Sequence, residues 1–205
     1  MALLRQLVLA CLAVALTAGI TGCGSSDPLA ADSVTTIITE AKANTIAAQS
    51  FTVSGGPAAS LSVDLTIVRG RGCTGTIVQG TTTWKLIWTG QTVYAHTARM
   101  PANEWMRAAS STSDIQGLID LCKPGSLLAP LSASGLSSAV RTVTTYDGQP
   151  AVALNWTDPR NGQPGSIVVT DTQTPVLLNI SQPGSGNLTF TGYGSTTTIA
   201  PPAAG

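Results

Sequence analysis

The chain has 205 residues, with 10 Lys+Arg, 10 Asp+Glu and one His, so its formal net charge at pH 7 is +0. It contains no basic run of the kind that nucleic-acid binding requires, so no nucleic-acid partner is expected. Only 10% of the residues are charged and 43% are hydrophobic, which excludes a wholly disordered chain and favours a β-rich domain with uncharged polar faces.

The first 22 residues have the pattern of a signal peptide. Arg5 is followed by an uncharged apolar run over residues 7–16. This run is shorter than the roughly 20 apolar residues that cross a bilayer, so residues 1–22 are predicted to be cleaved. Cleavage leaves 205 − 22 = 183 residues, which suits one domain with its own core.

The signal pattern ends in Ile20-Thr21-Gly22-Cys23, a branched apolar residue, two small residues and a cysteine. This motif resembles the lipobox of bacterial lipoproteins. The resemblance implies that Cys23 receives a diacylglyceryl thioether and anchors the chain at the outer face of the cytoplasmic membrane. An ordinary secretory signal that happens to end in cysteine is the alternative. With Cys23 acylated, residues 23–30 would form a lipidated tether.

Two further cysteines, Cys73 and Cys122, remain after Cys11 leaves with the signal peptide and Cys23 is acylated. An exported chain meets an oxidising compartment, where such a pair is predicted to form a disulfide. A redox or metal pair is the alternative. The chain has no C-x-x-C and a single histidine, His96, so no metal site is expected.

The pattern of apolar residues predicts two helices and two groups of strands. The first helix begins at Asp32 or Ser33 and runs to about Gln49, and the second runs from about residue 114 to Cys122. The strands are expected at 50–54, 61–67, 73–79, 82–88, 92–97 and 104–106, and then at 140–146, 151–156, 166–170, 175–181 and 188–193.

Short connections between these strands predict antiparallel hairpins, of which Asp147-Gly148 is the strongest signal. An antiparallel sheet of this many strands curls strongly, and the helices would cover its concave face. The predicted fold is therefore α+β, a strongly curved antiparallel half-barrel with helices on its concave face. The domain is predicted to span residues 31–195, with a flexible tail at 196–205.

Several segments carry a resemblance to a known family. The lipobox precedes an amphipathic helix, and it is followed by Gly70-Arg71-Gly72-Cys73-Thr74-Gly75-Thr76, by Gly90-Gln91-Thr92-Val93-Tyr94, and by Trp105 before a helix that ends in Leu121-Cys122. Over about residues 23–195 the chain resembles actinobacterial lipoproteins of the mycobacterial LppX/LprG type, whose fold is LolA-like. The resemblance implies an apolar cavity for acyl chains and the carriage of a lipid or lipoglycan in the cell envelope.

Apolar strand and helix positions are the candidates for the lining of such a cavity. Acyl chains bind by burying area, at about 25 cal/mol per Å², so the walls need no polar groups. For each candidate, the alternative is a position in a packed core. The candidates are Val63, Leu65, Ile67, Leu86, Trp88, Val93, Leu118, Leu154, Trp156 and Leu178.

No catalytic residues and no cofactor are predicted. His96 has no recognisable nucleophile motif, and Gly184-Ser185-Gly186 does not match the Gly-x-Ser-x-Gly elbow. Two functions remain: a lipid-anchored envelope protein that binds a lipid ligand, or a surface lipoprotein with a filled core that binds an envelope protein partner or assists a sensor. A monomer is expected in either case.

Overall fold

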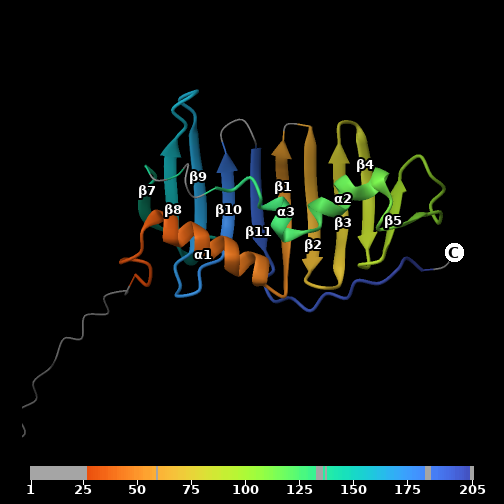
Figure 1. Cartoon of the computed structure of the whole chain (residues 1–205), viewed down its shortest axis with the longest axis horizontal. Coiled ribbons are helices and arrows are strands. Elements are labelled where there is room, and N and C mark those ends of the chain that lie inside the picture. Colours follow the sequence, from red (N-terminus) through yellow and green to blue (C-terminus); the bar gives the residue numbers. More distant parts are fainter. Residues whose placement is uncertain (1–26, 59, 133–135, 137, 183–185, 204–205) are drawn as a thin grey trace, which may run out of the picture.

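Eleven antiparallel strands form one open sheet in the computed structural model, which describes residues 27–58, 60–132, 136, 138–182 and 186–203. Within these residues the sheet order is β6-β5-β4-β3-β2-β1-β11-β10-β9-β8-β7, so two meanders join where β1 pairs with β11 (Figure 1). The strands are β1 (Ser50–Ala58), β2 (Leu61–Val68), β3 (Gly72–Gln79), β4 (Thr82–Trp88), β5 (Thr92–Thr97), β6 (Met106–Ala109), β7 (Val140–Tyr146), β8 (Gln149–Thr157), β9 (Pro164–Thr170), β10 (Leu177–Gln182) and β11 (Gly186–Thr191).

The predicted α+β architecture is confirmed, with an antiparallel sheet that does not close into a barrel. The predicted signal peptide and Cys23 lie outside the described residues. Several predicted boundaries differ from those observed. β1 continues to Ala58, beyond the end predicted at residue 54, because β2 and β11 pair with it on both sides through Gly55. The strand expected at 104–106 lies instead at Met106–Ala109.

Helix α1 (Val34–Ala47) crosses one face of the sheet (Figure 1). Ser33 is its N-cap, as predicted, and the Ser33 hydroxyl accepts a hydrogen bond from the Thr36 backbone N–H at 3.1 Å. Ile37, Ile38 and Ala41 are fully buried, so this face of the helix packs on the sheet.

A long connection between β6 and β7 returns across the same face as α1 (Figure 1). It contains a 3-10 turn (Ser113–Ile115) and two short helices, α2 (Gln116–Leu121) and α3 (Pro124–Leu127). A disulfide joins Cys73 of β3 to Cys122 at the end of α2, with the Cα atoms 5.6 Å apart. The predicted disulfide is therefore present, and it fastens the connection to the sheet.

The glycine-rich segment around Cys73 lets β3 approach both of its neighbours. Gly72 has a φ of 126°, and a Cβ there would lie 1.7 Å from the Trp88 carbonyl oxygen. Gly75 has a φ of 150°, and a Cβ there would lie 2.0 Å from the Asp64 carbonyl oxygen. Because both neighbours are backbone atoms, a side chain at either position would force the strands apart.

Candidate functional site

Six of the ten predicted lining residues lie in one core cluster between the sheet and the helices. Each is at most 3% exposed, and the cluster also contains Ile37 and Ile38 of α1 and Ile119 of α2. In this conformation the six side chains are packed against their neighbours, and their role in lining a cavity stays a prediction. The six are Val63, Leu65, Ile67, Leu86, Val93 and Leu154.

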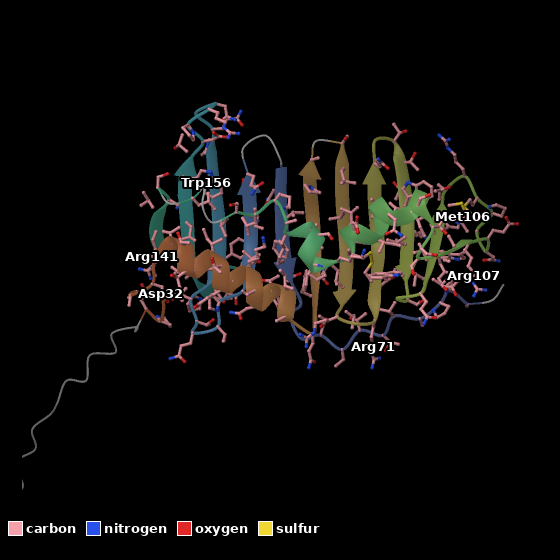
Figure 2. All side chains as sticks on the ribbon, viewed as in Figure 1. Asp32, Arg71, Met106, Arg107, Arg141 and Trp156 are labelled. Carbon is pink, nitrogen blue, oxygen red and sulfur yellow. A yellow bond between two sulfur atoms is a disulfide. The ribbon has the colours of Figure 1, made fainter. Side chains whose placement is uncertain are left out.

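The other four predicted residues are not members of this cluster. Trp88, Leu118 and Trp156 are half-buried and pack against the cluster, whereas Leu178 is buried outside it. Trp156 lies toward the opposite end of the sheet from the β2–β3 turn (Figure 2), and its ring covers Gly165, where a Cβ would lie 2.3 Å from the ring. Nine of the ten candidates therefore lie in or against one core cluster, and the cavity that they would line stays a prediction.

An apolar groove of about 470 Å³ opens where the last turn of α1 meets the β2–β3 turn and the α2–α3 junction. We call this the disulfide groove, because Cys122 is part of its wall. Ile67 and Trp88 are the two predicted lining residues that border it. Its full lining is Ile46, Ile67, Val68, Arg69, Gly70, Arg71, Gly72, Trp88, Gly90, Cys122, Lys123 and Pro124.

The rim of the disulfide groove is cationic. Arg69 and Arg71 flank Gly70 in the β2–β3 turn, both side chains are exposed, and neither has an ion-pair partner among the described residues. Figure 2 shows Arg71 at the lower edge of the sheet. Lys123 lies 3.0 Å from the carboxylate of Asp120, in an exposed pair of small energetic weight.

Trp88 adds a polar group to an otherwise apolar wall. Its indole Nε1 is buried and has no hydrogen-bond partner among the described residues. A buried donor without an acceptor is unfavourable. An acceptor that enters the groove would reach the indole N–H only after the groups that cover it move.

A smaller opening of about 160 Å³ lies on the other side of α3, beside β10 and β11. Leu127, Leu128 and Leu131 border it on the side of the helix, and Ile180 and Leu188 border it on the sheet. The Lys42 ammonium donates a hydrogen bond to the Leu131 carbonyl at 2.9 Å, which ties α1 to this segment.

An ion pair fixes the first described residues to the far end of the sheet. Arg141 of β7 binds the Asp27 carboxylate, and Leu29, two residues later, is 1% exposed. Although burial acts to raise it, the hydrogen bond and charge of Arg141 hold the pKa of Asp27 below its ordinary value. Burial, and then the nearby Asp27 carboxylate, raise the pKa of Asp171. The predicted tether therefore includes residues that are docked on the domain.

The only histidine has structural contacts. The His96 Nε2 lies 3.3 Å from the Pro101 carbonyl oxygen, and its ring lies 5.5 Å from the ring of Trp105. Within the described part of the chain, no group of three or more His, Cys, Asp or Glu side chains could hold a metal ion. None of the helices in that part is both long and apolar enough to cross a membrane.

Arg69 and Arg71 are not among the site residues predicted from the sequence, because charged residues between two strands are typical of an exposed turn. Ile46 and Pro124 are not among them either, because their contribution depends on the ends of two helices meeting one turn. Two arginines on either side of a glycine between strands were the available signal.

No protein-family profile matches the chain, and no curated protein matches it in sequence. Among solved structures, the chain is similar to LprF from Mycobacterium bovis. The two are 16% identical, the match covers 83% of this chain and 97% of the LprF chain, and the TM-score is 0.55. The chain therefore has the fold of LprF, which confirms at the level of fold the LppX/LprG resemblance predicted from the sequence.

Proposed function

We propose that this protein is an envelope lipoprotein that is anchored through Cys23 and binds the acyl chain of a lipid between its helices and its sheet. The disulfide groove carries the proposal: it is apolar, it leads toward the core beside Ile67, and its volume of about 470 Å³ falls in the usual range for ligand pockets. The LprF-like fold supports it, because the LppX/LprG resemblance, which the fold bears out, implies a cavity for acyl chains.

The ligand would enlarge the groove by displacing the connection between β6 and β7. The six buried lining candidates fill the space beneath the helices, so a long acyl chain needs this segment to move. Helix α2 has 6 residues and α3 has 4, and helices this short depend on tertiary packing for stability. Because openings lie on both sides of α3, we expect this helix to move first when a ligand enters.

The docking of Asp27 sets the distance from the proposed anchor to the domain. Three residues, 24–26, separate Cys23 from Asp27, so the four peptide steps span at most about 14 Å. The β7 end of the sheet would therefore face the membrane closely. The disulfide groove lies at the other end of α1, a helix of 14 residues that is about 21 Å long.

Lipid analysis of the purified protein tests the proposal. Residues 23–205 contain every described element, so we expect this proposed mature chain with Cys23→Ser to fold without a covalent lipid. Solvent extraction followed by mass spectrometry would then detect only bound ligand. We expect co-purified lipid, and we expect Ile46→Trp to reduce it by filling the groove. Met106→Trp is the matched control, because Met106 is 48% exposed on β6 and does not line the disulfide groove. Absence of lipid, together with no uptake of an added fatty-acyl probe, would refute the proposal.

A protein-binding role is the second candidate, and the edge strand β7 favours it. Among the described strands β7 ends the sheet, so one side of its backbone is unpaired, and Val140 and Val143 are 66% and 57% exposed. Such an edge can accept a strand from a partner. Under this alternative, the same analysis finds no lipid and the groove variant behaves like the wild type.

A further inference from the structure

We propose that the disulfide groove selects lipids with an anionic headgroup, which Arg69 and Arg71 bind at its rim. This inference rests on the proposed function and names the class of its ligand. The juxtaposition that carries it is a pair of arginines between an apolar groove and a hydroxyl-lined groove, beside a buried indole N–H. Among the described residues the two arginines have no ion-pair partner and the indole N–H has no acceptor.

The two arginines are held in place by the turn between β2 and β3. The Arg69 backbone N–H donates to the Gln49 carbonyl at 2.9 Å, and the Arg71 N–H donates to the Val68 carbonyl at 3.0 Å. Gly70 between them has a φ of 72°, which completes a tight turn. The backbone positions of the two arginines are therefore fixed and close together. Their guanidinium groups can bind one phosphate or carboxylate together.

The surroundings of the arginines divide into an apolar side and a polar side. On one side lies the disulfide groove. On the other lies a groove of about 490 Å³ that Arg69 and Arg71 also border. Its remaining wall comes from Gln49, Ser50, Val68 and residues 194–198, and it is rich in hydroxyl groups, which Ser50 and residues 195–198 carry. An amphiphile that bridges the two grooves would place its acyl chain in the first and its headgroup at the arginines.

The C-terminal segment forms the polar wall because it is bonded to the start of β1. The Gly194 N–H donates to the Ser50 carbonyl at 3.0 Å, and the Ser50 hydroxyl donates to the Ser195 carbonyl at 2.6 Å. Figure 1 shows this segment continuing along the same end of the strands. The hydroxyl groups of Thr196, Thr197 and Thr198 can therefore contribute hydrogen bonds to a polar headgroup.

The charge of the site matches an anion and not a cation. Arg69, Arg71 and Lys123 border the disulfide groove, and no aspartate or glutamate does. Within the groove wall, the unpaired indole N–H of Trp88 is a donor and also calls for an acceptor. A zwitterionic headgroup would bring its own cation to this rim and lose much of the attraction.

Calorimetric titration with short-chain lipids tests the inference. Dihexanoyl phosphatidylglycerol and dihexanoyl phosphatidylcholine carry the same acyl chains, so the difference in their Kd reports the headgroup. For the Cys23→Ser mature chain we expect about tenfold tighter binding of the anionic lipid, since charge-assisted hydrogen bonds contribute at this level. The variant Arg69→Gln/Arg71→Gln should lose this preference, because its Kd for phosphatidylglycerol should rise more than its Kd for phosphatidylcholine, whose phosphate the arginines also contact.

The matched control is Arg99→Gln/Arg160→Gln, which removes the same charge at two exposed positions away from the groove and should keep the preference. Equal affinities for the two lipids in the wild type, or an equal loss for both lipids in Arg69→Gln/Arg71→Gln, would overturn the headgroup assignment. Glycerol phosphate binding as tightly as the anionic lipid would also overturn it, because the site would then recognise a free phosphate. Failure of both lipids to bind would refute the proposed function itself.

Discussion

Reduction of the disulfide between Cys73 and Cys122 should cost a large share of the stability of this domain. The bond closes a loop with a sequence separation of 49 residues. In the chain-entropy model, opening a loop of this size lowers the free energy of unfolding by about 4 kcal/mol. For a chain of about 200 residues, that corresponds to a decrease in Tm of about 8–16 °C.

The assay compares the thermal unfolding of the oxidised protein with that of protein refolded in reductant. Refolding is needed because both cysteines are buried, so a reductant added to the native protein would not reach the disulfide. The reduced wild type keeps both sulfur atoms, so the difference isolates the crosslink from core packing. The double variant Cys73→Ala/Cys122→Ala is the control, and its Tm should not respond to reductant. A wild-type Tm that is the same in both conditions would refute the reasoning, as would two free thiols in the untreated protein.

Two further predictions concern the glycine segment and the ion pair at β7. Gly72→Ala should lower the free energy of unfolding, measured by urea titration, by about 3 kcal/mol or more, because its Cβ would lie 1.7 Å from the Trp88 carbonyl oxygen. Gly70→Ala is the control: its Cβ would have no neighbouring atom within 4 Å, so it should cost only about 1 kcal/mol in the same titration. Arg141→Ala should cost about 1–2 kcal/mol at pH 7. The deficit should begin to close as the pH falls below 3.8, the ordinary pKa of Asp27, and should close fully only below the lowered pKa that Asp27 has in the folded protein. Urea unfolding from pH 7 to pH 3 measures this, and a deficit that is constant across the range would contradict it.

Local patterns in the sequence predicted most of the fold. Alternation in 61–67 gave β2, the hydroxyl of Ser33 marked the start of α1, and the Asp147-Gly148 signal became a hairpin in which both residues have positive φ. These features are local, because each depends on the periodicity or backbone preference of neighbouring residues.

Features that depend on distant segments were not predictable in the same way. β1 continues through Gly55 and Gly56 because β11, more than 120 residues later in the chain, pairs with it from Gly56↔Asn187 to Thr52↔Thr191. The disulfide groove likewise forms where the ends of α1, β2, β4 and α2 meet. The sequence offered apolar residues for a lining, but it could not show which of them border open space and which fill a core.

The pairing of β1 with β11 also sets the order in which the molecule can be completed. When the first meander, β1 to β6, has been synthesised, one edge of β1 still has no partner strand, because that edge pairs with β11. Phe51 and Val53 of β1 are then not yet packed against Phe190 of β11. Every strand of the second meander must be made before the two halves can join, because the joining strand is the last. A chain truncated before Gly186 therefore lacks β11, so no strand joins β1 to β10. The edges of the two meanders stay unpaired, and the core between them is incomplete.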